Sequence, residues 1–428
     1  MKTPRVSKEK NTNSVIIVGG GFAGLNAAKT LADHTGFQVT LIDQRNHHLF
    51  QPLLYQVATA GLNPADIAVP IRAQFAGSEN VSVRWGAVKG VNLEKNLIYS
   101  EDVEIEYDFL VLACGAQHSY FGHPEWEEFA PGLKTVEQAT EIRRRILSAF
   151  ERAENELDLE KQKTLLTFVI VGGGPTGVEL AGAIADISRT VLIKDFKRID
   201  PSKAKIILVE AGPRILVPFA EELSQKAQAD LVELGVEVQT NARVMNINAE
   251  GVQIGDGFTF AKSVFWAAGV QGAKMDFTPA IELDRLGRVK VKMDLSLHNY
   301  PKVFIAGDMA SLEISPGVSL PGLAPVAMQA GIHVGKTILN SLSNKDRKAF
   351  LYRDKGQMAT IGKNRAILEF KNIRIGGFIA WIAWLFVHIF YLIGFKNRIS
   401  VMANWVWSYA FSKRGARLIT NKEWKLTP

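Results

Sequence analysis

The stretch Val15–Gly24, VIIVGGGFAG, decides the fold of this chain. Four apolar, mostly β-branched residues lead into the pattern Gly19-x-Gly21-x-x-Gly24, and the Ala/Leu-rich segment Leu25–Leu31 follows. This order predicts a strand, a tight turn and a helix. Gly19 makes the turn, Gly21 lets the backbone approach a pyrophosphate, and Gly24 lets the helix pack closely on the strand. The free N–H groups at the helix start face the phosphates.

A carboxylate completes this first motif. A second predicted strand, Gln38–Ile42, ends in Asp43, which lies 19 residues beyond Gly24. An acid at this distance holds a ribose hydroxyl of a bound dinucleotide. Glycine-rich turns are common, so the glycines alone are weak evidence. The complete order of strand, turn, helix, strand and acid favours a dinucleotide site over an ordinary turn.

The same pattern returns in the middle of the chain. The apolar segment Leu165–Val171 leads into Gly172-x-Gly174-x-x-Gly177, and a later predicted strand ends in Glu210. The acid lies 33 residues beyond the third glycine, which we attribute to a longer helix and to the loop Lys194–Lys205. A Glu at a strand end accepts a hydrogen bond from a ribose 2′-OH and repels a 2′-phosphate, which favours NADH over NADPH. Two rival acids, neither after a buried strand, are Asp195 and Asp200.

Length and composition narrow the class of protein. With 428 residues, 47% of them hydrophobic, the chain is expected to hold two or three domains around a large core. Its single cysteine, Cys114, excludes an intrachain disulfide, an iron–sulfur cluster held by several thiolates, and a CxxC redox pair. Redox chemistry must therefore come from bound cofactors, and no metal site is expected. Residues 1–13 are polar and basic, lack the apolar run of a secretory signal, and are expected to be a disordered tail.

The positive charge gathers at the C-terminal end. From Lys345 to Pro428 there are 16 Lys and Arg against 4 Asp and Glu, although the whole chain carries only +7. The segment Ile375–Phe395 has 21 residues without a charged side chain, long enough to span a membrane. His388, paired glycines and basic residues at both ends argue against a span, and Val401–Ile419 is typical of a helix lying in the interface. We favour a monotopic anchor on an anionic lipid surface, then a single span, then nucleic-acid binding. Five of the eight tryptophans lie here: Trp381, Trp384, Trp405, Trp407 and Trp424.

Other segments predict the remaining framework. Phe109–Gly115, Ser263–Val270 and Val303–Ala310 are expected to be buried strands, Thr135–Glu160 a charged helical stretch, and Leu323–Leu342 a helix. The apolar, aromatic segment Asn46–Leu62 is either the bed of a flat ligand or a helix packed into the core, and spacing alone does not decide between them.

Taken together, the motifs resemble those of the type II NADH:quinone oxidoreductases, single-subunit, membrane-attached flavoproteins of respiratory chains. The resemblance covers Val15 to Ile419. The residues that carry it are GGGFAGL (Gly19–Leu25), HLFQPLLYQVA (His48–Ala58), VGGGPTGVELAG (Val171–Gly182), WAAGV (Trp266–Val270), AGD (Ala306–Asp308), DKGQMATIGKNRAI (Asp354–Ile367) and AWIAWLFVHIFYLIGFKNR (Ala380–Arg398).

This resemblance implies an α/β fold with two Rossmann-like dinucleotide-binding domains, in the flavoprotein architecture of glutathione reductase, and a C-terminal amphipathic helical membrane anchor. The expected boundaries are 14–117 and 273–344 for the FAD-binding domain, 118–272 for the NADH-binding domain, and 345–428 for the membrane-association region.

The resemblance also assigns candidate site residues. Those expected to hold non-covalent FAD are Gly19, Gly21, Phe22, Ala23, Gly24, Asp43, His48, Ala113, Gly115, Gly307, Asp308 and Ala324. Those expected to bind NADH are Gly172, Gly174, Pro175, Thr176, Gly177, Glu179, Glu210, Ala268 and Gly269. Those expected to line the quinone site are Gln51, Pro52, Tyr55, Gln56 and Gln329. The family pattern AQxAxQ departs at Pro325, which removes one amide from the quinone side.

The implied reaction is hydride transfer from NADH to the flavin, followed by transfer of two electrons to a membrane quinone, without proton pumping. Glu179 and Gln329 are the expected catalytic residues, with Glu179 either positioning groups or relaying a proton; the alternative for Glu179 is that it only complements the helix dipole. We also expect a homodimer attached to the cytoplasmic face of a bacterial inner membrane. Alternatives are an NADH-sensing or other-acceptor reductase and a sulfide:quinone oxidoreductase, although the latter needs at least two reactive cysteines.

Overall fold

The computed structural model describes residues 12–100, 103–343, 345–411 and 414–420, which fall into two compact units. Unit 1 comprises residues up to 48 together with 69–117 and 270–354, and unit 2 comprises 49–68, 118–269 and 355–428. Most of the tail expected over residues 1–13 lies outside the described residues, and the first strand begins at Asn13.

Unit 1 is built on a six-stranded sheet in the order β21-β22-β9-β1-β2-β5. All neighbouring strands are parallel except β21, which pairs antiparallel with β22. The central strands are buried because their residues are almost all Val, Ile, Leu or Phe. The bounds are β1 (Asn13–Val18), β2 (Phe37–Asp43), β5 (Val81–Trp85), β9 (Phe109–Leu112), β21 (Ser296–Leu297) and β22 (Tyr300–Ile305).

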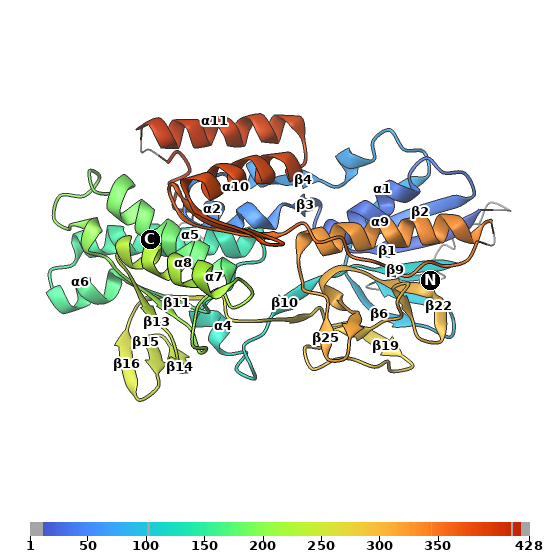
Figure 1. Ribbon diagram of the computed structural model, residues 1–428, viewed down its shortest axis with the longest axis horizontal. Coiled ribbons are helices and arrows are strands. Elements are labelled where there is room, and N and C mark those ends of the chain that lie inside the picture. Colours follow the sequence, from blue (N-terminus) through green and yellow to red (C-terminus); the bar gives the residue numbers. More distant parts are fainter. Residues whose placement is uncertain (1–11, 101–102, 344, 412–413, 421–428) are drawn as a thin grey trace. The chain divides into compact units, whose positions relative to one another are not determined.

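Two helices, α1 (Phe22–Leu31) and α9 (Ala324–Ser341), pack against each other on one side of this sheet, opposite β6 and β19 (Figure 1). The helices approach closely because Gly331 of α9 lies against the Ala23 carbonyl, where an added Cβ would come within 2.0 Å of the oxygen. A second sheet has the order β19-β6-β7-β8. Its strands and the other short elements of the unit are β6 (Val88–Asn92), β7 (Leu97–Ser100), β8 (Val103–Glu106), β19 (Asp276–Thr278), β20 (Val289–Lys290), β23 (Ala310–Ser311), β24 (Glu313–Ser315) and β25 (Val318–Ser319).

Unit 2 repeats the first architecture with a four-stranded parallel sheet in the order β13-β12-β11-β17. The strands are β11 (Thr167–Val171), β12 (Lys205–Val209), β13 (Val236–Gln239) and β17 (Ser263–Trp266). The helices are α7 (Pro175–Asp186) and α8 (Glu221–Glu233), and an antiparallel sheet adds β14 (Val244–Asn248), β15 (Gly251–Ile254) and β16 (Gly257–Phe260). A π-helical turn, Ile187–Val191, extends α7, which confirms the longer helix inferred from the distance to Glu210.

The C-terminal part of unit 2 forms a three-stranded antiparallel sheet and two helices. The elements are β26 (Gln357–Gly362), β27 (Arg365–Phe370), β28 (Ile373–Gly377), α10 (Phe378–Tyr391) and α11 (Phe395–Phe411). In Figure 1, α10 lies between this sheet and α11. Among the described residues, no helix has both the length and the apolar character that crossing a membrane requires.

Two predicted helical stretches have different bounds in the structure. The uncharged segment Ile375–Phe395 is not one continuous element, because its first residues pair with β27 as part of β28 and Gly377, with φ +83°, turns the chain into α10. The second predicted helix, Val401–Ile419, begins earlier and ends earlier, as α11.

The predicted helical stretch Thr135–Glu160 is divided into α5 (Val136–Asn155) and α6 (Leu159–Leu165). The break occurs where Asp158 caps a new helix by accepting hydrogen bonds from the backbone N–H groups of Glu160 and Lys161. The expected strands ending at Gly115, Val270 and Ala310 stop three to five residues earlier, at Leu112, Trp266 and Ile305.

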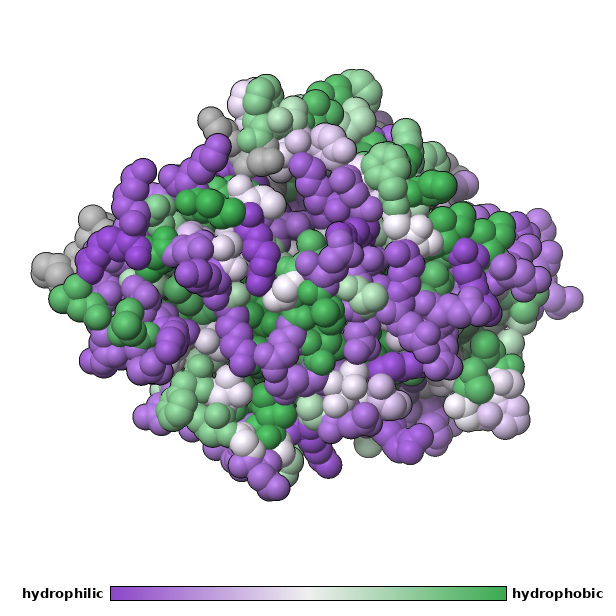
Figure 2. Space-filling view, turned by 60° about the vertical axis from the view of Figure 1, so that its left-hand side comes forward, coloured by the Kyte–Doolittle hydropathy of each residue, from purple (hydrophilic) through white to green (hydrophobic). Residues whose placement is uncertain are grey.

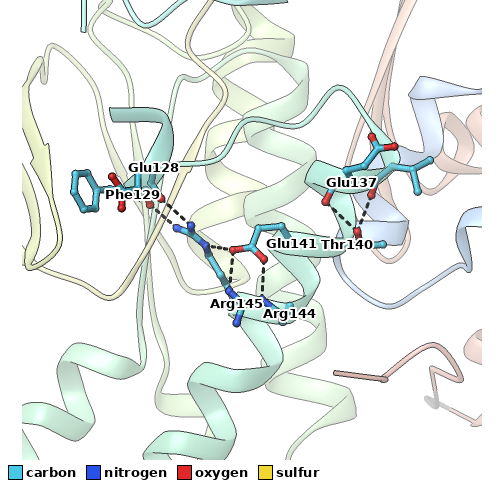
Figure 3. Close-up of polar contacts among 8 residues, drawn as sticks. Glu128, Phe129, Glu137, Thr140, Glu141, Arg144 and Arg145 are labelled. Carbon is cyan, nitrogen blue, oxygen red and sulfur yellow. Dashed lines mark hydrogen bonds and ion pairs between the residues drawn. The ribbon is translucent and has the colours of Figure 1, made fainter. Parts of the chain in front are cut away.

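A cluster of polar contacts fixes the start of α5 (Figure 3). Glu141 accepts hydrogen bonds from the guanidinium groups of Arg144 and Arg145, at 2.7–2.8 Å. Arg145 also donates to the carbonyls of Glu128 and Phe129, at the end of α4 (Trp126–Phe129). Burial alone raises the pKa of Glu141, but the hydrogen bonds from the two arginines lower it to about 2. The ionised cluster therefore ties α5 to the segment that precedes it.

The apolar segment Asn46–Leu62 forms a short helix packed into the core. The 3₁₀ turn Gln51–Leu53 leads into α2 (Leu54–Ala58), whose side chains are mostly buried. The helix packs against α5 and α7, and α3 (Pro64–Ile67) follows it. The remaining short strands are β3 (His47–Leu49), β4 (Ala68–Pro70), β10 (Ala116–His118) and β18 (Val270–Gly272).

The packing of α7 on β26 generates the first prediction. An added Cβ at Gly182 would come within 1.7 Å of the Ile361 carbonyl oxygen. We expect Gly182→Ala to lower the free energy of unfolding by about 1–3 kcal/mol or more, because two backbones must separate. Denaturant unfolding measures this change in the free energy of unfolding. Gly77→Ala is the control, because an added Cβ at Gly77 would meet nothing within 4 Å. Equal stability of the two variants would contradict this packing.

Candidate functional site

The turn after β1 forms an open cradle at the start of α1. Gly19 has φ +102°, and an added Cβ there would come within 2.3 Å of the Ala113 carbonyl oxygen, so no other residue fits. Gly21 caps the helix, and an added Cβ there would meet nothing within 4 Å. The backbone therefore faces open space at the positive end of α1, which fits the close approach of a pyrophosphate. Asp43 accepts a hydrogen bond from the Gly20 N–H at 2.6 Å, so its carboxylate stands beside the turn.

His48 adds a buried acceptor to the same unit. Its Nδ1–H donates to the Gly20 carbonyl at 2.9 Å, and its ring meets that of Phe22 edge to face, with 5.1 Å between centroids. Burial lowers the pKa of His48 to about 4, so the ring is neutral at pH 7. Its Nε2 is buried and has no hydrogen-bond partner among the described residues. A ligand with hydroxyl groups would satisfy this nitrogen.

The other residues expected around FAD lie in unit 1 as well. Gly307 and Asp308 form a 3₁₀ turn directly after β22, and Ala324 is the first residue of α9. Because β22 is parallel to β9 and β9 to β1, the carboxyl ends of all three strands meet at the edge that carries the Gly19 turn. Ala113 and Gly115 follow β9 at this edge. The sequence-predicted set is thus gathered at one edge of one sheet.

Gln329 lies in the first turns of α9, with both ends of its amide engaged. Its Nε2 donates to the Arg353 carbonyl, and its Oε1 accepts from the Arg353 N–H, each at 3.0 Å. The second hydrogen of the amide nitrogen is the group left for a ligand.

The second glycine turn has the same construction. Gly172 has φ +110°, and Gly174 caps α7 with open space where its Cβ would be. Glu210 accepts hydrogen bonds from Gly173 N–H and Gly212 N–H, both at 2.7 Å. Pro175 and Thr176 occupy the first turn of the helix. The expected adenosine side of the dinucleotide therefore lies toward the carboxyl end of β12, which Glu210 directly follows.

An exposed phenylalanine that sequence reasoning missed stands at the other side of this turn. Phe121 has φ +51°, is 62% exposed, and places its ring against Gly269, where an added Cβ would be 2.7 Å from the ring. Ser119 holds the segment, because its N–H donates to the Gly269 carbonyl at 3.1 Å and its carbonyl accepts from Trp266 Nε1 at 2.9 Å. The only signal in the sequence is a glycine after the aromatic residue.

Glu179 lies on α7 in a setting that favours its neutral form. Its Oε1 lies 3.5 Å from the Thr360 N–H of β26, a long hydrogen bond. Burial raises the pKa of Glu179 to about 8, against the weaker effect of that hydrogen bond. The carboxyl group therefore carries a proton at neutral pH. Asp186, seven residues later on the same face, accepts from the Lys363 N–H at 3.0 Å.

The structure brings Glu179 together with the α2 residues expected at the quinone site. Burial and the nearby Glu179 raise the pKa of Tyr55 well above its usual value, so its hydroxyl keeps its proton. Gln56 Nε2 donates to the Tyr55 hydroxyl oxygen at 2.9 Å, and Trp405 Nε1 of α11 donates to Gln56 Oε1 at 2.7 Å. Gln51 is exposed and donates to the Lys134 carbonyl at 3.2 Å, with Pro52 beside it in the 3₁₀ turn.

A half-buried arginine, Arg414, also belongs to this region, and sequence reasoning did not assign it to the site. Arg414 Nη1 donates to the Thr59 carbonyl at 2.7 Å, just after α2. Burial lowers the pKa of Arg414, while Asp186 and Tyr55 act in the opposite direction. The ionisable groups around Tyr55 thus come from α7, as Glu179 and Asp186, and from the chain after α11, as Arg414.

Comparison with known proteins gives a consistent result. Residues 13–331 match the family model of the pyridine nucleotide-disulphide oxidoreductases, and residues 355–414 match that of the NDH2 C-terminal domain. The chain is 41% identical to the type II NADH:quinone oxidoreductase Ndh of Mycobacterium tuberculosis, over 96% of this chain and 90% of that protein. It is 40% identical to NdhA of the same organism, over 95% and 89%.

Solved structures share the fold. NDH2 from Plasmodium falciparum in complex with NADH has a TM-score of 0.88 at 20% identity, covering 96% of this chain and all of that one. The sulfide:quinone oxidoreductase from Aquifex aeolicus has a TM-score of 0.72 at 18% identity, covering 94% and 96%.

The position of Glu210 generates a prediction about the dinucleotide. We expect Glu210→Gln to reduce the preference for NADH over NADPH about tenfold, because the carboxylate no longer repels a 2′-phosphate. The ratio of kcat/KM for the two dinucleotides measures it. Glu237→Gln, on the neighbouring strand β13 and paired with Lys205, is the matched control. An unchanged ratio in Glu210→Gln would show that another residue reads the 2′ position.

Proposed function

Because this chain belongs to the type II NADH:quinone oxidoreductases, we propose a role for each part of the site described above. As a member of this family the protein oxidises NADH and passes two electrons to a quinone without pumping protons. When bound, FAD supplies the chemistry, since it accepts a hydride and releases two electrons. What the protein contributes is binding, orientation and control of protons.

In this proposal the two glycine turns divide the nucleotides between them. The turn after β1, with Asp43, His48 and Asp308, holds FAD without a covalent bond, and the open space at Gly21 supports this assignment. The turn after β11, with Glu210, holds NADH, and Gly174 faces similar open space. The domain boundaries given from the sequence, 14–117 with 273–344 and 118–272, stay predictions.

The quinone head group, in this proposal, binds beside Tyr55, Gln56 and Glu179 of unit 2, with Gln51 and Pro52 as further lining residues. The quinone-side role expected for Gln329, which belongs to unit 1, stays a prediction from the sequence. The observation that carries it is Glu179, a carboxylic acid that keeps its proton at neutral pH and lies near enough to the buried Tyr55 for its ionised form to raise the pKa of that hydroxyl. Reduction of a quinone to a quinol consumes two protons. A protonated carboxyl group next to the site provides a donor for one of them.

Neither alternative is favoured. A sulfide:quinone reaction requires reactive thiolates, and this chain has a single cysteine. Burial raises the pKa of Cys114 to about 12, so its thiol is not ionised at neutral pH. No observation supports a sensing role, and the relatives that this chain resembles are enzymes.

The outer sides of α10 and α11 support peripheral attachment to a membrane. Figure 2 shows hydrophobic side chains gathered over these helices. Two basic residues, Lys396 and Arg398, lie in the first turn of α11 and suit an anionic lipid surface. The exposed apolar residues include Phe378, Ile379, Phe386, Phe390, Phe395, Met402 and Val406. The cytoplasmic face of a bacterial inner membrane is the side that we propose, and the homodimer stays a prediction.

Glu179 provides the direct test of the proton assignment. We expect wild-type quinone reduction to decline as pH rises through about 8, because Glu179 loses its proton there. Glu179→Gln should lower kcat with quinone at least tenfold and remove this inflection, while FAD content stays the same. Rates with ferricyanide, an acceptor that takes no proton, should be unchanged.

The control is Glu221→Gln, at the exposed start of α8. A pH profile in Glu179→Gln that keeps the wild-type inflection would assign the titration to another group and leave Glu179 as a complement of the helix dipole.

The membrane proposal has a separate test. We expect the triple variant Phe386→Ser, Phe390→Ser, Val406→Ser to lose most of its co-sedimentation with anionic vesicles, because each side chain is about 70% exposed and contributes apolar area only to the lipid. The matched control places serine at Met245, Phe258 and Phe260, the exposed apolar residues of β14 and β16. Equal binding of the two variants to vesicles would reject the α10–α11 face.

A further inference from the structure

We propose that Trp405 is a positioning residue for quinone reduction: through Gln56, its indole N–H directs the hydroxyl hydrogen of Tyr55 away from Gln56 and toward the quinone. This inference rests on the proposed function, since it assumes that the quinone binds beside Tyr55. Trp405 lies on α11, and 349 residues separate it from Gln56.

The direction of the two hydrogen bonds follows from donor chemistry. An indole Nε1–H only donates, so the atom of Gln56 that it meets at 2.7 Å must be the carbonyl oxygen. The amide nitrogen of Gln56 then faces Tyr55, and its N–H donates to the hydroxyl oxygen at 2.9 Å. The hydroxyl oxygen is thereby an acceptor from Gln56. Its own hydrogen must point elsewhere, and it is free to donate to a carbonyl oxygen of the quinone.

Without the indole N–H, nothing described here fixes the amide. Rotating the Gln56 amide by half a turn would exchange its oxygen and nitrogen with little change of shape. The amide oxygen would then accept the Tyr55 hydroxyl hydrogen, which removes that hydrogen from the quinone side. Trp405 therefore selects one of two nearly equivalent orientations of Gln56.

A polar clamp holds α11 where the indole can act. Asp66 of α3 accepts hydrogen bonds from Ser400 Oγ at 2.7 Å and from Asn404 Nδ2 at 3.3 Å. Asn397 Nδ2 donates to the carbonyls of Ala65 and Asp66, each at 3.0 Å. These residues share the inner side of α11 with Trp405, whereas Met402 and Val406 are exposed. The helix with the proposed lipid-facing side thus also supplies the group that orients the site.

The test is Trp405→Phe, which keeps an aromatic ring and removes the N–H. We expect KM for a short-chain benzoquinone to rise about fivefold to tenfold, the effect of one hydrogen bond, with KM for NADH and the rate with ferricyanide unchanged. Calorimetric binding of the same quinone to the oxidised protein should weaken by the same factor. The matched control is Trp381→Phe, at a half-buried tryptophan of α10 with no indole hydrogen bond among the described residues.

A second variant, Gln56→Leu, tests whether Trp405 acts through Gln56. In Gln56→Leu no amide remains to rotate, so adding Trp405→Phe should have no further effect on KM for the quinone. An equal KM in Trp405→Phe and Trp381→Phe, or a full effect of Trp405→Phe in the Gln56→Leu background, would overturn the role of Trp405.

Tyr55→Phe tests the premise. If it raises KM for the quinone while Trp405→Phe does not, the site stands and only the positioning role fails. If Tyr55→Phe itself leaves both KM and quinone binding unchanged, the proposed quinone site at Tyr55 fails, and this inference fails with it.

Discussion

The contact between the backbones of α7 and β26 is the constraint on which the organisation of unit 2 depends. Gly182 lies so close to the Ile361 carbonyl that no side chain fits between them. The same face of α7 carries Glu179 and Asp186, each within reach of a backbone N–H of β26 or of the turn that follows it. The helix that begins at the second glycine turn, where we propose that NADH binds, is thereby joined to the C-terminal sheet that carries α10. One helix thus holds both the proposed nucleotide site and the sheet beneath the proposed lipid-facing helices.

Acidic residues have two different environments in this protein, and the difference supports the different roles that we propose for them. Asp43 ends β2, Glu210 directly follows β12, and both accept short hydrogen bonds from nearby backbone N–H groups. Glu179 is half-buried and receives only a long hydrogen bond, and the burial of its carboxyl group raises its pKa to about 8. The first two suit a fixed carboxylate that holds a ribose, whereas the third suits a group that carries a proton. In the proposed function, carboxyl groups at strand ends thus bind the nucleotides, and a carboxyl group on the packed face of α7 supplies a proton.

The local patterns in the sequence were enough to predict both glycine turns, the strands that end in Asp43 and Glu210, and α9. Each depends on residues near one another in the chain. The prediction for Ile375–Phe395 was wrong in its bounds because hydropathy does not reveal that Ile373–Gly377 pairs with β27. The contacts of Trp405 with Gln56 and of Ser400 with Asp66 join residues more than 330 positions apart, and no local pattern marks them. Phe121 was missed because its position depends on a left-handed backbone and on Gly269.

The most direct measurement of the central claim is anaerobic stopped-flow of the purified yellow protein. NADH is mixed first, a quinone second, and the visible absorbance of the flavin is followed throughout. We expect NADH to bleach the absorbance and the quinone to restore it at least as fast as the enzyme turns over. Bleaching that the quinone does not reverse at that rate would contradict the account, because the electrons would then leave by another acceptor.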